Sequence, residues 1–268
     1  MSPTAQPGPL RAEGTQMGVP YRSAPLNGGV ADLHVDLYLP EGPRDPAPVL
    51  VWFHAGAFCV GTTKRPQHRA LGRRMASAGM ALAVPSYRLS TPEEDLSAPV
   101  RDALPGLLAM CPPGFRLELA GSWALAALED SVAALRWLDE RRETLGLTGR
   151  FVVGGSSAGA INAMNLVHTA PHLGLETPDI GGVLCYSGAY AYPGIYRPGA
   201  VPVVALHHPA DPKIDIASIR TLASRDPKVK LTETSADEHG GFAKTASEPP
   251  RKVFGRILGH VREMSGTA

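Results

Sequence analysis

The stretch Phe151-Val-Val-Gly-Gly-Ser-Ser-Ala-Gly-Ala160 decides the fold of this chain. Its first residues are apolar and read as a short buried strand, and a helical pattern over residues 158–168 follows directly. Gly155, Ser157 and Gly159 match the pattern G-x-S-x-G, in which small neighbours let a strand and a helix approach each other around an exposed serine. The pattern therefore predicts that Ser157 is a nucleophile at a sharp strand-to-helix turn.

Ser156 is the neighbouring candidate for this role. Centring the pattern on Ser156 would require glycine at position 158, and that residue is Ala158. The pentapeptide alone is weak evidence because its residues are common, so a structural serine in a glycine-rich turn is the alternative. The apolar strand before the motif and the helix after it favour the nucleophile.

Strand and helix patterns alternate through most of the chain. Strands are predicted at residues 30–39, 49–53, 81–84, 151–153, 182–186, 201–206 and 228–232, and helices at 65–78, 126–145, 158–168 and 253–264. This alternation predicts an α/β fold with a mostly parallel central sheet flanked by helices. In such sheets the functional site lies at the carboxyl ends of the strands.

One domain is expected over residues 21–268, after a flexible N-terminal tail at residues 1–20, where proline and glycine are frequent. Residues 90–123 interrupt the alternation and combine prolines with many apolar residues. This segment is too apolar for a free linker, so we expect a lid-like insertion or a substrate-pocket insertion. An ordinary crossover with a long irregular loop is the alternative.

Composition and charge exclude several classes of function. The chain carries 26 Lys and Arg against 25 Asp and Glu, so neither nucleic acid nor an anionic membrane is expected as a partner. No apolar run is long enough to span a bilayer, and the N-terminus lacks the pattern of a signal peptide, so a cytoplasmic location is expected. The sequence does not decide the oligomeric state, for which a homodimer is one option.

No cofactor and no metal site are expected. The three cysteines are widely spaced and suggest neither a disulfide framework nor a metal centre. His207 and His208 are adjacent, but the residues around them do not match the pattern of a metal site. These two side chains are expected to be structural or to line a pocket.

Acyl transfer through a serine needs hydrogen-bond donors that stabilise an oxyanion. The stretch Val51-Trp-Phe-His-Ala-Gly-Ala-Phe58 follows a buried strand and resembles the H-G-G-G loop of lipases and esterases. The resemblance assigns the backbone N–H groups of Ala55 and Gly56 as donors, and the residue after the nucleophile, Ala158, supplies a third. His54 is expected to shape this loop, with a buried capping histidine without chemistry as the alternative.

Two later loops supply the remaining catalytic candidates. With this motif the carboxylate and then the histidine follow the serine along the chain. Asp211 stands in an Asp-Pro turn just past the strand at 201–206, with Asp215 as the alternative, and His239 follows the strand at 228–232. We expect His239 to be the general base and Asp211 to orient it.

Together these features resemble the α/β-hydrolase superfamily, and within it the carboxylesterases similar to hormone-sensitive lipase. The matching stretches are His54-Ala-Gly-Ala57, Ser86-Tyr-Arg-Leu89, Ala126-Ala-Leu-Glu-Asp130, Gly155-Ser-Ser-Ala-Gly159, Asp211-Pro212 and His239-Gly240. The resemblance implies the α/β-hydrolase fold and a serine esterase that cleaves a small or medium carboxylic ester through an acyl-enzyme on Ser157. One departure is that residues 90–125 separate the second and third of these stretches.

Other functions remain open beside the ester hydrolase. An amidase or formamidase, an acyltransferase, or a biosynthetic lyase or cyclase could use the same triad, because one fold hosts many reactions. A non-catalytic, hydrolase-like binding protein is a third class. The complete set of Ser157, Asp211 and His239 argues against it, because a binding module has no need of all three.

Overall fold

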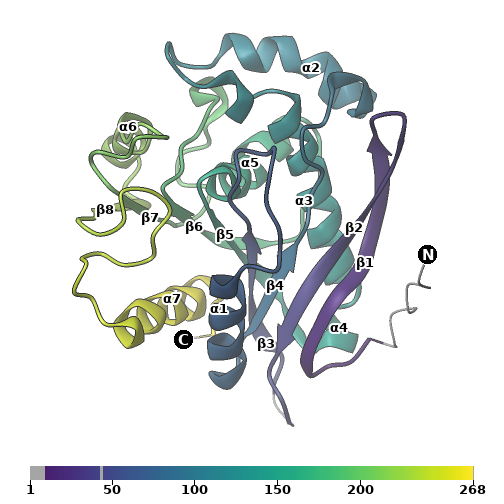
Figure 1. The fold of residues 1–268 in the computed structure, drawn as a ribbon, viewed down its shortest axis with the longest axis vertical. Helices are drawn as coiled ribbons and strands as arrows, with labels where there is room; N and C mark the ends of the chain where they lie inside the picture. The colour runs from purple at the N-terminus through teal and green to yellow at the C-terminus, as the bar shows by residue number, and fades with distance from the viewer. Residues whose placement is uncertain (1–9, 43–44, 268) are drawn as a thin grey trace.

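The computed structural model describes residues 10–42 and 45–267, which form one eight-stranded sheet in the order β1-β2-β4-β3-β5-β6-β7-β8 (Figure 1). The strands are β1 (Gly14–Leu26), β2 (Gly29–Leu39), β3 (Ala47–Phe53), β4 (Ala81–Pro85), β5 (Leu147–Ser156), β6 (Ile180–Tyr186), β7 (Val203–His207) and β8 (Val229–Glu233). The pairs β1–β2 and β2–β4 are antiparallel, and the other neighbours are parallel. The expected mostly parallel sheet is confirmed.

Helices cover both faces of the sheet. The helices are α1 (Pro66–Ser77), α2 (Ala98–Ala109), α3 (Ser122–Glu140), α4 (Arg142–Leu145), α5 (Ala158–His172), α6 (Ala217–Arg225) and α7 (Pro250–Ser265). Successive side chains of a strand point to opposite faces. Leu50 and Val152 therefore pack with α1 and α7, whereas Val51 and Phe151 pack with α3 and α5. No helix in the described part of the chain is long and apolar enough to cross a bilayer.

The N-terminal prediction needs a correction. The expected flexible tail at residues 1–20 is wrong for residues 14–20, because β1 begins at Gly14 and pairs with β2. Val19 in this strand is buried, and the backbone N–H of Gly18 donates to Asp36 Oδ1 at 2.7 Å. Residues 1–9 of the same prediction lie outside the described residues.

The segment at residues 90–123 is folded. It contains the short 3-10 turns η1 (Glu93–Asp95) and η2 (Leu117–Leu119) around α2, and Figure 1 shows α2 above the ends of the strands. Val100, Leu104 and Leu107 of α2 are buried. Pro99 lies in the first helical turn, where a proline removes no helical hydrogen bond.

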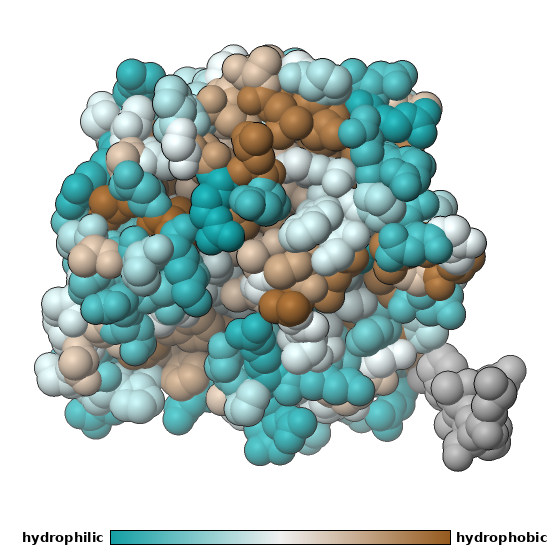
Figure 2. Space-filling model, turned by 45° about the horizontal axis from the view of Figure 1, so that its top comes forward, coloured by the Kyte–Doolittle hydropathy of each residue, from teal (hydrophilic) through white to brown (hydrophobic). Residues whose placement is uncertain are grey.

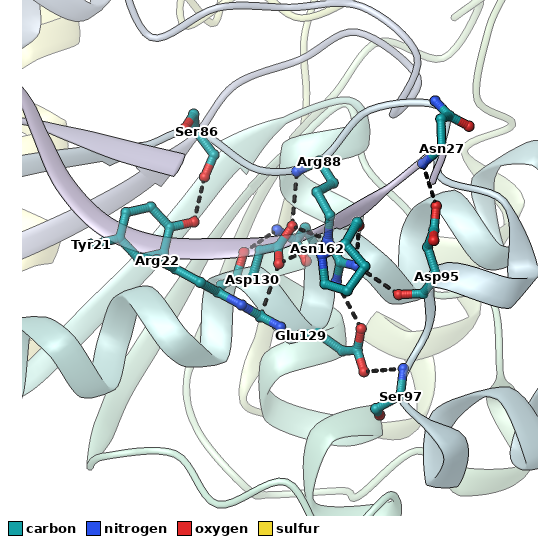
Figure 3. Close-up of polar contacts among 12 residues, drawn as sticks. Tyr21, Arg22, Asn27, Ser86, Arg88, Asp95, Ser97, Glu129, Asp130 and Asn162 are labelled. Carbon is teal, nitrogen blue, oxygen red and sulfur yellow. Dashed lines mark hydrogen bonds and ion pairs between the residues drawn. The ribbon is translucent and has the colours of Figure 1, made fainter. Parts of the chain in front are cut away.

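Arg88 anchors the start of this segment (Figure 3). Its side chain is buried, and Nε donates to Asp130 at 3.0 Å while one terminal nitrogen donates to Glu129 at 2.8 Å. The other terminal nitrogen donates to the Asp95 carbonyl at 2.8 Å, and Glu129 accepts the N–H of Ser97 at 3.0 Å. The Arg88 guanidinium thus connects the loop after β4 with α3 and with Asp95, and its partner Glu129 holds Ser97 at the start of α2.

Substituting Arg88→Met is expected to lower the free energy of unfolding by about 3–5 kcal/mol, because it leaves the buried Glu129 without its cation and Asp130 with Arg22 alone. Chemical denaturation with urea measures this change. Arg142→Met is the matched control, because Arg142 pairs with Asp139 on the surface and should leave the midpoint unchanged. Equal midpoints for the two variants would contradict the role given to Arg88.

Candidate active site

Ser157 lies at the turn between β5 and α5 in a strained backbone conformation, with φ 57° and ψ −123°. Such positive φ values are costly for a residue with a side chain and often occur at functional sites. A Cβ atom on Gly155 would lie 2.3 Å from the carbonyl carbon of Gly159. One on Gly159 would lie 2.1 Å from the carbonyl oxygen of Phe53. Only glycine fits at these two positions, which explains the spacing of the motif.

Three of the predicted site residues form a line of hydrogen bonds. His239 Nε2 lies 2.9 Å from Ser157 Oγ, and His239 Nδ1 lies 2.8 Å from Asp211 Oδ2 and 2.9 Å from Oδ1. The three side chains come from the ends of β5, β7 and β8, at the carboxyl edge of the sheet. The structure thus brings together residues that are far apart in the sequence.

Asp211 is buried behind His239 and held as a carboxylate. Burial raises its pKa, but hydrogen bonds from His239 and from the N–H groups of Lys213 and Ile214 outweigh burial, so the pKa lies below its usual value. His207 packs against the same carboxylate, with Nε2 at 3.3 Å from Asp211 Oδ2 and 2.9 Å from the Ile214 carbonyl. Burial lowers the pKa of His207, which favours its neutral form.

The loop that carries His239 is held from two sides. Ser156 Oγ donates to the carbonyl of Gly240 at 3.2 Å, and the N–H of Gly240 donates to Ser187 Oγ at 2.8 Å. Ser156 thus supports the loop that carries His239, whereas Ser157 Oγ is the hydroxyl that lies next to the His239 ring. Sequence reasoning missed Ser187, and no local pattern marks it, because its partner lies 53 residues away.

The loop after β3 also has a shape that its sequence requires. Gly56 has φ 140°, and a Cβ atom there would lie 1.7 Å from the carbonyl oxygen of Val60. The ring of His54 stacks on Tyr87 at 4.1 Å between centroids, and its Nδ1 lies 3.1 Å from the Ala55 carbonyl. These contacts fix the ring of His54 within the loop. Burial lowers the pKa of His54 to about 4, so the ring is neutral at neutral pH.

A cavity of about 420 Å³ opens over Ser157 and His239, with Ala55 and Gly56 in its wall. Ala158 is the first residue of α5, where backbone N–H groups have no acceptor within the helix. Figure 2 shows this end of the molecule turned toward the viewer, with hydrophobic and hydrophilic areas intermixed. Backbone donors, a serine and a histidine next to one cavity suit attack on a carbonyl carbon.

Several other candidates do not join this group. Asp215 is exposed, and its Oδ1 accepts a hydrogen bond from the N–H of Ala217 at 2.8 Å. The partner of His239 Nδ1 is Asp211. His208 is half-exposed, and its Nδ1 accepts the N–H of Ala210 at 3.1 Å. Within residues 10–42 and 45–267, no group of three His, Cys, Asp or Glu side chains is placed to hold a metal ion.

Comparison with solved structures identifies the class of fold. Esterase 2 of Thermogutta terrifontis in its apo form superposes with a TM-score of 0.68 over 99% of each chain, at 17% sequence identity. The propionate-bound form of that esterase gives a TM-score of 0.66 over 96% of each chain, at 18% identity. The form phosphorylated by paraoxon gives 0.64 over 97% of this chain and 96% of the esterase. The protein has the α/β-hydrolase fold.

Sequence comparisons match parts of the chain. A family model described as BD-FAE matches residues 35–107, a region that includes the loop after β3 but not Ser157. A probable isoprenylcysteine alpha-carbonyl methylesterase of Oryza sativa subsp. japonica is 35% identical over 77 residues, which are 29% of this chain and 18% of the relative. The resemblance to esterases that the sequence predicts is confirmed, over the whole chain for the fold and over part of the chain for the sequence.

Replacing Gly159 with Ala is expected to destabilise the protein by about 1–3 kcal/mol or more, because the added methyl group would overlap the backbone of β3. Thermal and urea denaturation measure the loss. Gly255→Ala in α7 is the matched control, since a Cβ there meets nothing within 4 Å. That control should be neutral or stabilising by about 0.5–1 kcal/mol, as expected for glycine in a helix interior. Equal stability of both variants would contradict the close contact at the turn.

Proposed function

We propose that the protein is a serine carboxylesterase that cleaves a small or medium carboxylic ester through an acyl-enzyme on Ser157. The observation that carries this proposal is the line of hydrogen bonds from Asp211 through His239 to Ser157. This arrangement matches what a serine nucleophile needs, namely a base within reach and a carboxylate that orients the base. The Thermogutta esterase shares the fold, the Oryza methylesterase shares part of the sequence, and both support ester hydrolysis as the reaction.

The mechanism follows from the roles of the three side chains. His239 Nε2 accepts the proton of Ser157 as Oγ attacks the ester carbonyl, and the imidazolium then gives this proton to the leaving alcohol. Asp211 holds the tautomer in which Nδ1 carries a proton, and its charge stabilises the imidazolium. Water attacks the acyl-enzyme in the second half-reaction, with His239 again as the base.

The N–H groups of Ala55, Gly56 and Ala158 are proposed to stabilise the oxyanion of each tetrahedral intermediate. Two of these residues lie in the cavity wall beside Ser157, and the third begins α5 directly after it. The helix N-terminus adds a favourable field for negative charge. The insertion at residues 90–123 is proposed to form part of the substrate pocket, because Arg116 and Leu119 belong to the same cavity wall.

The first experiment combines a panel of 4-nitrophenyl esters from acetate to palmitate with labelling by a fluorophosphonate. Turnover of the shorter esters and a single adduct on the peptide that contains Ser157 are expected. Ser157→Ala should abolish the adduct and lower kcat by roughly 10⁶-fold, since the triad acts as a unit. Ser224→Ala, an exposed serine of α6, is the matched control. No turnover on any acyl length, or an adduct on Ser156, would sink the proposal.

Gly56→Ala tests the oxyanion loop, because a Cβ cannot fit against the Val60 carbonyl without moving the donors. The expected result is a fall in kcat of about 10²–10³-fold, the usual effect of losing an oxyanion donor. Stopped-flow measurement of acylation on 4-nitrophenyl acetate reports this step directly. An acylation rate within threefold of wild type would remove Gly56 from the proposed donor set.

A further inference from the structure

The wall of the cavity over Ser157 carries an unbalanced charge. Arg65, Arg116 and Lys213 line it, and among the described residues no Asp or Glu does. The whole chain is nearly neutral, with 26 Lys and Arg against 25 Asp and Glu. If the charged residues of the cavity wall reflected the composition of the chain, they would include both cations and anions. The excess of positive charge is therefore specific to this cavity.

The three cations come from separate parts of the chain, and the fold brings them together at this cavity. Arg65 precedes α1, Arg116 belongs to the insertion just before η2, and Lys213 follows Asp211 by two residues. Arg116 and Lys213 also line a neighbouring cavity of about 400 Å³ and therefore stand at the junction of the two. No single helix or loop accounts for the cluster.

These charges are available to a ligand. Within the described residues, neither Arg65 nor Lys213 has a carboxylate within 4.0 Å, and Arg65 only donates to the Ala55 carbonyl at 3.3 Å. Arg116 lies 3.8 Å from Glu118, a loose pair in which both side chains are more than half exposed. Such a pair contributes little and can be exchanged for a better partner.

The other carboxylates near the site do not line this cavity: Asp215 lines the neighbouring one, where its Oδ1 accepts the N–H of Ala217, and Asp211 lies behind His239. The side chain of Asp211 is fully buried, and His239 stands between it and Ser157. An entering substrate therefore meets positive charge in a concave site, where low-dielectric walls focus the field.

Resting on the proposed esterase function, we infer that the natural substrate is an ester that carries a second, anionic group, a carboxylate, on its non-reacting part. Arginine and lysine recognise carboxylates through charge-assisted hydrogen bonds, and arginine can bind both oxygens at once. Arg65, Arg116 and Lys213 supply these donors from the cavity wall. The preference is for the half-ester of a dicarboxylic acid, or a similar acid-bearing ester, over a neutral ester of the same length.

The test compares two matched substrates, mono-4-nitrophenyl adipate and its neutral analogue methyl 4-nitrophenyl adipate, at pH 7.5. The expected ratio of kcat/KM values is at least about tenfold in favour of the anionic ester, within the range of charge-assisted hydrogen bonds. Raising the ionic strength to 0.5 M should reduce this ratio, because salt screens charges at a partly exposed site.

Variants then connect the preference to the cavity wall. Lys213→Gln and Arg116→Gln should each lower the anionic-to-neutral ratio by about threefold or more, and Lys213→Glu should bring it to one or below. Using the ratio within each variant removes any general effect on catalysis. Lys64→Gln, an exposed neighbour of Arg65 outside the cavity wall, is the matched control and should keep the wild-type ratio.

The outcomes separate this inference from the esterase proposal. If both adipates are hydrolysed at equal kcat/KM, or if Lys213→Glu leaves the ratio unchanged, the anionic substrate is wrong while the esterase proposal stands. If neither ester is hydrolysed and Ser157 takes no fluorophosphonate, both proposals fail together.

Discussion

The rest of the site depends on a contact between three backbones, where α5 leaves β5 against the end of β3. Gly155 and Gly159 allow this contact, since a methyl group on either would overlap the neighbouring main chain. Phe53 is the last residue of β3, and the loop with Ala55 and Gly56 follows it at once. The contact that places Ser157 at the cavity therefore also sets its distance from the N–H groups of that loop. The strained φ of Ser157 is the conformational cost of this arrangement.

A second constraint places His239 and Asp211. Hydrogen bonds continue past the strand ends, since the N–H of Ser157 donates to Tyr186 at 2.9 Å and the N–H of Ser187 donates to Leu206 at 2.8 Å. The two loops that follow β7 and β8 are thereby built on an ordered edge of the sheet. His239 comes from the outermost strand and must return across β6 and β7 to reach Ser157. Gly240, with φ 81°, permits this return and binds Ser187 on the way.

Local sequence patterns were sufficient to predict most of the helices and strands. They also predicted the three residues that hydrogen bonds join at the site, Ser157, His239 and Asp211. The motif around Ser157 encodes a contact between near neighbours in the chain, and the order of strands points to the loops of Asp211 and His239. Strand β1 was missed because Pro20, Pro25 and two register irregularities mask its alternation. The helix α2 was missed because its prolines read as breakers, although one of them lies in the first turn. In both cases tertiary contacts override weak local preference.

The cations of the cavity wall could not be read from the sequence for a different physical reason. Charge summed over the chain hides a cluster that only the fold assembles. Arg116 illustrates this, because its position depends on the insertion, which Arg88 fixes at its start and which a bond from Ser122 Oγ to the Thr91 carbonyl at 2.8 Å closes at its base. The groups proposed for chemistry come from loops that begin where strands end, as the chain order predicts. The groups proposed to select an anionic ester come from segments joined only by long-range contacts, so the proposed preference depends on the folded cavity wall.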